Sequence, residues 1–187
     1  MRTLIPVKQL STQQLDDLRE YVEADLKKKA AIDHPAVKDW VSRQLLPWTD
    51  LVIVHAAQAG ILTDFWGCGA QVASTLLVYV PNTALRNTQY VGIYGINIRD
   101  TNPAVIKILF QTGGGASTLG NWNVEHIYGQ EVPEAVTPEY IYYPGNSIIQ
   151  IQLLPNTVGK AVGADGVSDH VVLIGLICQP AGEVVSM

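Results

Sequence analysis

The sequence has few charged residues. Asp, Glu, Lys and Arg make up 16% of its 187 residues, whereas a typical globular chain has about 25%. The shortage is greatest in residues 44–187, which contain four Lys or Arg and ten Asp or Glu, a net charge of −6. So few charges cannot cover the surface evenly, and an acidic surface does not attract nucleic-acid phosphates. We therefore expect a partner to cover part of the surface, and we expect no direct nucleic-acid binding.

The sequence also lacks the segments that direct a chain into or across a membrane. It has no run of about 18 apolar residues, so we expect no membrane-spanning segment. Its first residues lack the long apolar region of a signal peptide, and its two cysteines, Cys68 and Cys178, lie far apart and outside any CxxC pattern. These absences predict a protein made in the cytoplasm without a disulfide framework. The chain is long enough for one domain with a buried core.

A helix is expected near the N-terminus. Ser11 can cap its first turn, and Gln14 completes the capping-box pattern three residues later. Apolar residues then recur at spacings of three and four, as on one face of a helix: Leu15, Leu18, Val22 and Leu26. A helix this short is marginal alone in water. Its apolar stripe must therefore dock, either on the body of the same chain or on a neighbouring molecule.

A second, shorter helix is expected before Pro47. The triplet Asp33-His34-Pro35 is typical of a helix start with proline in the first turn. Its apolar face would consist of four residues: Val37, Trp40, Val41 and Leu45. We therefore expect residues 1–47 to form a helical N-terminal arm.

The remaining sequence has the pattern of β-strands joined by Gly- and Pro-containing turns. Alternation is clearest in residues 89–99, 104–111 and 147–154. In the first of these segments, strict alternation would place these residues on one face: Tyr90, Gly92, Tyr94, Ile96 and Ile98. Further strands are expected at 51–57, 72–80, 140–143 and 170–179, and near Phe65 and Val124. Because no strong helix interrupts them, we predict an all-β fold, an antiparallel jelly-roll-like β-sandwich over residues 48–180 with a tail at 181–187.

The candidate catalytic motifs are incomplete. Gly113-Gly114-Gly115 lacks the Lys-Ser/Thr that follows a phosphate loop, and a flexible turn is the better interpretation. Cys68 lies between two glycines, but no histidine is near it in sequence, although the fold can still bring one close. No metal-ligand spacing occurs among the histidines, which are His34, His55, His126 and His170. We therefore expect no catalytic residue, no cofactor and no metal.

Trp122 lies in the polar segment Gly120-Asn121-Trp122-Asn123, which is typical of an exposed loop. An exposed tryptophan can anchor a protein interface or form a sugar-binding platform, and we favour the interface. The predicted assembly interface combines the helical stripe with two tryptophans: Leu15, Leu18, Val22, Leu26, Trp40 and Trp122.

The order of these features resembles the jelly-roll structural proteins of phages. The resemblance rests on the strand-and-turn series at 88–111, the stretch at 140–155 and the closing strand at 171–180. It covers residues 48–180 without a short diagnostic motif. The chain looks like a capsid decoration (cement) protein, or like a small single jelly-roll coat protein of icosahedral phages with internal membranes. The resemblance implies a virion subunit, made in the host cytoplasm, that is not an enzyme.

Three functions remain open on the sequence. The first is a capsid subunit that forms a dimer or trimer and binds other capsid proteins, with the helical arm as a clip between subunits. Under this hypothesis, deleting residues 1–30 leaves the sandwich folded and weakens assembly. The second is a carbohydrate- or receptor-binding module that uses aromatic loops. The third is a small enzyme that uses Cys68 or a cluster of histidines.

Overall fold

The computed structural model describes residues 3–46, 50–51, 65–66, 77–98, 105–127, 134–155 and 169–183. These residues contain the helix α1 (Thr12–Asp33), three short 3-10 helices and ten strands. The strands are β1 (Ile5–Pro6), β2 (Trp40–Gln44), β3 (Phe65–Trp66), β4 (Leu77–Ala84), β5 (Tyr90–Ile98), β6 (Val105–Thr112), β7 (Ser117–Asn123), β8 (Glu134–Tyr143), β9 (Ile148–Pro155) and β10 (Asp169–Pro180).

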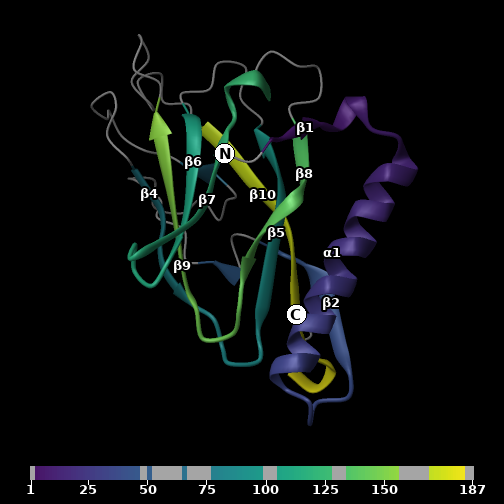
Figure 1. The fold of residues 1–187 in the computed structure, drawn as a ribbon. Helices are drawn as coiled ribbons and strands as arrows, with labels where there is room; N and C mark the ends of the chain where they lie inside the picture. The colour runs from purple at the N-terminus through teal and green to yellow at the C-terminus, as the bar shows by residue number, and fades with distance from the viewer. Residues whose placement is uncertain are drawn as a thin grey trace.

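The strands form two antiparallel sheets that pack face to face (Figure 1). The first sheet has six strands in the order β1-β8-β5-β10-β2, with β3 also paired to β10. The second has four strands in the order β4-β9-β6-β7. From β4 to β10 the chain changes sheet at every connection except that between β6 and β7, which pair with each other. The predicted all-β sandwich with antiparallel strands is therefore confirmed.

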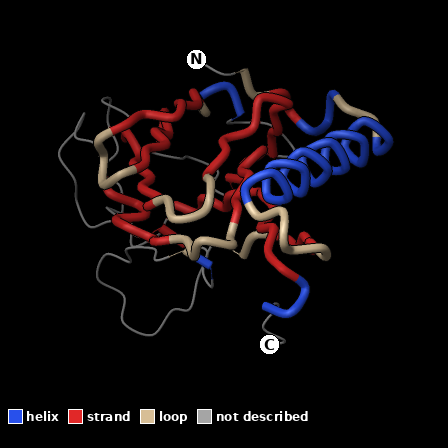
Figure 2. Tube along the Cα trace, turned by 60° about the horizontal axis from the view of Figure 1, so that its bottom comes forward, coloured by secondary structure: helices blue, strands red, loops and turns tan. Residues whose placement is uncertain are grey.

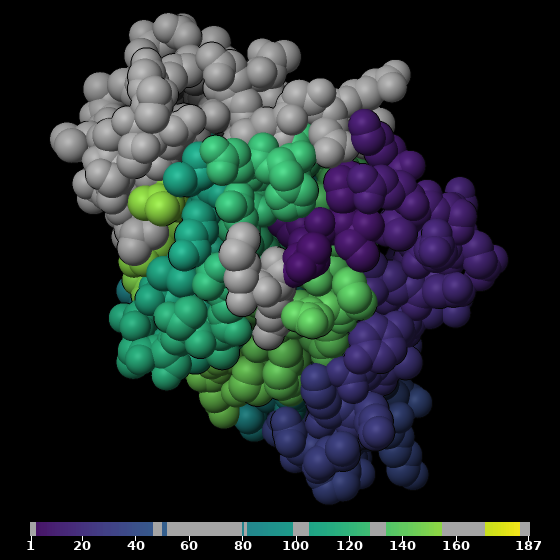
Figure 3. Space-filling view, turned by 45° about the horizontal axis from the view of Figure 1, so that its top comes forward, coloured from purple at the N-terminus to yellow at the C-terminus, as the bar shows by residue number. Residues whose placement is uncertain are grey.

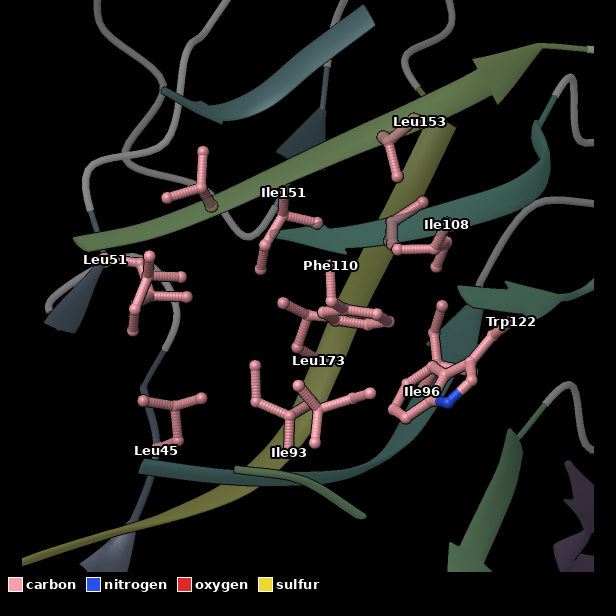
Figure 4. Packing of buried hydrophobic residues seen from close by; sticks show 14 of the residues in the cluster. Leu45, Leu51, Ile93, Ile96, Ile108, Phe110, Trp122, Ile151, Leu153 and Leu173 are labelled. Atoms are coloured by element: carbon pink, nitrogen blue, oxygen red, sulfur yellow. The ribbon is translucent and has the colours of Figure 1, made fainter. Parts of the chain in front are cut away.

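The inner faces of the two sheets enclose one large apolar core, shown in Figure 4. The six-stranded sheet contributes side chains such as Ile93, Ile96 and Leu173. The four-stranded sheet contributes Ile108, Phe110, Trp122, Ile151 and Leu153. The alternation predicted for 147–154 is confirmed, because Ile149, Ile151 and Leu153 are fully buried and the glutamines between them are only half-buried.

Strand β5 changes face at Tyr94. Against β10, the register passes from Ile93 directly to Gly95, so Tyr94 is the extra residue of a bulge, and the pairing with β8 is interrupted at the same position. Ile93 and Ile96 consequently both belong to the sandwich core, whereas Tyr90 packs on the opposite side with the helix. The prediction that alternate residues from Tyr90 to Ile98 share one face is wrong, because the bulge resets the alternation.

Helix α1 lies on the outer face of the six-stranded sheet, against β10, β2 and β5 (Figure 2). Its buried residues Val22, Leu26 and Ala30 join a second apolar cluster. The sheet residues of this cluster are Tyr90, Tyr140, Leu176 and Cys178. Gly92 leaves room for this contact, since a Cβ there would lie 3.1 Å from both Leu26 Cδ1 and Tyr140 Cδ2. The apolar stripe of the helix therefore docks on its own chain.

The second predicted helix is wrong. The residues expected on its face include Trp40 and Val41, which lie in β2 and pair with Pro180 and Gln179 of β10. Pro35 ends α1 instead of starting a helix, because the residue before a proline is pushed out of the helical region. His34 has φ −130° and ψ 72° and caps the C-terminus of α1. As a result, strands of one sheet lie on both sides of the expected boundary at residue 47.

The other predicted strands are confirmed where the structure describes them, except that Leu51, the first residue of the strand expected at 51–57, lies in a bend. Residues 104–111, 140–143 and 170–179 lie almost entirely within β6, β8 and β10. The segments 52–57 and 72–76 lie outside the described residues. No helix in the described part of the chain is both long and apolar enough to cross a membrane.

Candidate functional site

A hollow of about 460 Å³ lies where α1 meets the edge of the sandwich. Its lining comes from α1, β7 and β8: Tyr21, Asp25, Lys29, Leu119, Pro138, Glu139, Tyr140 and Tyr142. We call it the tyrosine hollow. The helical residues among them are spaced by four, so they form one row along α1, beside the buried row that packs on the sheet. In Figure 3 the purple N-terminal segment lies directly against the green surface of the sandwich.

Three polar groups in the hollow bind one another in a closed triangle. The Tyr140 hydroxyl donates to Asp25 Oδ2 at 2.5 Å. The Lys29 ammonium donates to Tyr140 Oη at 2.8 Å and forms an ion pair with Asp25 at 2.7 Å. This triangle joins the helix to a strand more than 100 residues away in the sequence, since Tyr140 is separated from Lys29 by 111 positions.

Aromatic rings surround the same ammonium group. Lys29 Nζ lies 4.3 Å from the ring centroid of Tyr142 and 5.0 Å from that of Tyr140. The two rings meet edge to face, with centroids 6.4 Å apart. A cation over a tyrosine face is attracted to the ring quadrupole. The lysine is therefore held by a carboxylate, a hydroxyl and two rings.

The electrostatics of the triangle favour fixed charges. Desolvation raises the pKa of Asp25, but the hydrogen bonds from Lys29 and Tyr140 outweigh it, and the net effect lowers the pKa below 3.8. Burial, and then the hydrogen bond to Asp25, raise the pKa of Tyr140. Burial, and then the charge of Asp33, raise the pKa of Tyr142 to about 12. At neutral pH the carboxylate is charged and both hydroxyls are protonated.

The hollow can therefore bind or fasten, but it is poorly suited to proton transfer. A general acid or base needs a pKa near the working pH, and these tyrosines are shifted away from it. Tyr21 remains 55% exposed at the rim, where its ring is available to a ligand. The arrangement favours a contact role over a catalytic one.

Of the six predicted interface residues, three are fully buried in the structure and three are half-buried. Val22 and Leu26 are 0% exposed and pack on the sheet of their own chain, whereas Leu15 and Leu18 are half-buried. Trp40 is half-buried and its ring meets Tyr90 edge to face at 5.7 Å. The inner half of the stripe therefore docks on its own chain and has no exposed surface for a neighbour.

The predicted exposure of Trp122 is wrong. The residue lies in β7, is 0% exposed, and packs on Phe110 with ring centroids 4.6 Å apart. Its neighbours Asn121 and Asn123 are half-buried and alternate with it along the strand. The asparagines gave the segment the composition of a loop, but period-two alternation points the tryptophan into the core.

The candidate reactive residues do not converge within the described chain. Cys68 and His55 lie outside the described residues. Among the residues that the structure describes, no group of three His, Cys, Asp or Glu is placed to hold a metal ion. Cys178 is a buried thiol on the helix side of β10, and burial raises its pKa, which makes it less reactive.

Sequence reasoning missed the tyrosine hollow. One half of it is visible in the sequence as the row Tyr21, Asp25 and Lys29 at helical spacing. The other half, Tyr140 and Tyr142, falls in a segment read only as an aromatic strand. The available sequence signal was the pair Asp25 and Lys29, one helical turn apart, with Tyr21 one turn before them. The strand on which this row packs could not be predicted, because the sheet topology determines it.

The chain matches no protein-family model, and no curated protein is significantly similar to it.

Proposed function

We propose that the chain is a structural subunit of a virion, either a capsid decoration (cement) protein or a small coat subunit, and that its sandwich is a jelly roll. The observation that carries the proposal is the strand order β2-β10-β5-β8 in one sheet and β4-β9-β6-β7 in the other. Among these eight strands the first pairs with the last, the second with the seventh, the third with the sixth and the fourth with the fifth. That nested pairing is expected of an eight-stranded jelly roll with two Greek keys.

Because one fold can host many functions, the proposal also depends on the chemistry of the surface. The strands of the four-stranded sheet contain one charged residue, Lys107. A sheet surface this poor in charge suits protein contacts better than permanent exposure to water. The tyrosine hollow fits the same role, because its triangle fastens α1 to β8 and gives a subunit a fixed shape.

Immunogold electron microscopy tests the proposal. Antibodies against the folded chain are applied to particles banded on a density gradient from a lysed source culture. We expect many gold particles at regular positions on capsids, in a number set by the symmetry of the shell. If the protein stays at the top of the gradient and the particles carry no label, it is not a virion subunit.

A carbohydrate- or receptor-binding module is the second candidate, and the tyrosine hollow favours it. An exposed Tyr21 ring beside Asp25 and Glu139 offers an aromatic platform with carboxylate acceptors. A glycan array separates the two candidates. Binding of a neutral sugar that is lost in Tyr21→Ala, with an unchanged melting temperature, would support the module.

A further inference from the structure

The outer face of the four-stranded sheet is chemically distinctive. Its residues on β6, β7 and β9 alternate with core residues, and six half-buried residues form its centre: Lys107, Leu109, Asn121, Asn123, Gln152 and Leu154. We call this set the amide face. The register makes it continuous, because Leu109 lies between Asn121 and Gln152 on the neighbouring strands. Lys107 likewise lies between Asn123 and Leu154.

We propose that the amide face is the surface through which a second copy of this chain binds, about a two-fold axis. This inference rests on the proposed function and names the surface by which the subunit assembles. An amide group both donates and accepts hydrogen bonds, so an amide-rich face is complementary to an identical face. The net charge of the chain is −5, and the amide face contains one cation and no acidic residue, so it carries none of the negative charges that make two copies repel each other.

Other classes of partner fit this face poorly. A nucleic acid requires clustered lysines and arginines, and Lys107 is the only charged residue on the four strands. A sugar platform requires an aromatic ring, and the rings of β6 and β7 belong to Phe110 and Trp122, which are both fully buried in the core. The face is left with three amides, two leucines and the single cation of Lys107, a composition that suits a protein contact.

The size of the face predicts the strength of the contact. Three strands spaced by about 4.8 Å and some seven residues long cover on the order of 350 Å². A stable interface buries about 800 Å² per partner, so a pair of amide faces is smaller than the standard. We therefore expect a weak dimer whose population rises with protein concentration. In a shell, many copies of the same contact would strengthen the assembly.

Charge-swap variants of the full chain test the inference. The lysine pair Asn121→Lys with Gln152→Lys and the glutamate pair Asn121→Glu with Gln152→Glu place like charges on both copies. The control Gln44→Lys makes the same amide-to-lysine change at an exposed position of β2 in the other sheet. Sedimentation equilibrium over a wide concentration range measures association, and thermal melts by circular dichroism verify that each variant is folded.

We expect each charged pair to raise the dimer dissociation constant at least about ten-fold, because like charges opposed across an interface disfavour the complex. The control should associate like the wild type. An equimolar mixture of the two charged pairs should recover association, since opposite charges then face each other. Recovery also excludes misfolding as the cause of the loss.

The outcomes separate the inference from the proposed function. A wild type that associates while neither charged pair weakens it contradicts the amide face and leaves a virion subunit with another contact. A wild type that stays monomeric at the highest concentration contradicts both self-assembly and the amide face. A glycan that binds the monomeric wild type and not the lysine pair would assign the face to carbohydrate and overturn the inference.

Discussion

The two sheets of the sandwich differ in what lies on their outer faces. The six-stranded sheet presents tyrosines, Leu176 and Cys178, and α1 covers them within the same chain. The four-stranded sheet presents amides, two leucines and Lys107, and the described contacts of α1 are made chiefly with the other sheet. An apolar face needs a permanent cover, whereas an amide face tolerates water and can exchange it for a partner. The helix therefore completes the fold on one side of the sandwich, and the proposed contact for assembly lies on the other side.

Deleting residues 1–30 should have the largest effect. It removes Val22, Leu26 and Ala30 and exposes the apolar cluster beneath them. Burying a large aliphatic side chain contributes roughly 1.5–3 kcal/mol, so the loss is comparable with the whole stability of a small domain. We expect the truncated chain to precipitate or to melt far below the full-length one in a circular dichroism melt.

The clip hypothesis instead predicts that this truncation leaves the sandwich folded, because it places the helix on a neighbouring subunit. A truncated chain that melts cooperatively near the full-length temperature would restore the clip and remove the distinction between the two outer faces. Deletion of residues 1–10 alone is the control: it removes β1 and the buried Leu4 but leaves α1 and its capping box in place, so it separates their contribution from that of the helix.

Single truncations in the two apolar clusters should come next. Trp122→Ala in the sandwich core should lower the free energy of unfolding by about 3–5 kcal/mol, and Leu26→Ala under the helix by about 3 kcal/mol. Leu15→Ala, at a half-buried position of the same helix, should cost clearly less. Chemical denaturation measures all three, and a Leu26→Ala effect as small as that of Leu15→Ala would show that the helix is loosely attached.

Replacing Tyr140 with phenylalanine should have a smaller, pH-dependent effect. The variant loses hydrogen bonds to Asp25 and Lys29, which together contribute about 1 kcal/mol. The pKa of Tyr140 is raised in the folded state, so its contribution is present below pH 10 and is lost as the pH rises above that value.

The measurement for Tyr140 is a series of melts from pH 7 to 11. The gap between wild type and Tyr140→Phe should narrow toward the alkaline end. Tyr21→Phe, at the exposed rim of the hollow, serves as the control and should show no such gap. A gap that stays constant with pH would mean that the hydroxyl is not held by the triangle.

Asp25→Asn should give the smallest effect, a few tenths to about 1 kcal/mol, as for other partly exposed ion pairs. The pKa of Asp25 is lowered in the folded state, so its contribution is present above pH 3.8 and is lost as the pH falls below it. Melts between pH 7 and 3 should converge for wild type and variant. Glu23→Gln breaks the ion pair to Lys27 on the same helix and is the matched control.

The parts of the fold that were predictable depend on local signals. The capping box of Ser11 and Gln14 needs only neighbouring residues, and both of its hydrogen bonds are present. Alternation in β9 needs only a strand with one buried face. Such signals involve only a few consecutive residues, so they can be recognised in the sequence alone.

The predictions that failed concern features that depend on contacts between residues far apart in the sequence. Residues Trp40–Gln44 form a strand because they pair with β10. The local sequence gives no sign of this pairing partner. The tyrosine hollow likewise joins α1 to β8 across 111 positions. The prediction for Trp122 failed for a different reason. Its flanking asparagines gave the segment the composition of a loop, although they lie on the outer face of a strand.

Hydroxyl-radical footprinting of the full chain at low and high protein concentration is the sharpest test of assembly through the amide face. We expect Leu109 and Leu154 on the amide face to lose reactivity as the concentration rises. Tyr140 and Leu176, which α1 covers, should be equally protected at both concentrations. A protein that oligomerises while Leu109 and Leu154 stay fully reactive, or while protection appears on the helix side instead, would contradict assembly through the four-stranded sheet.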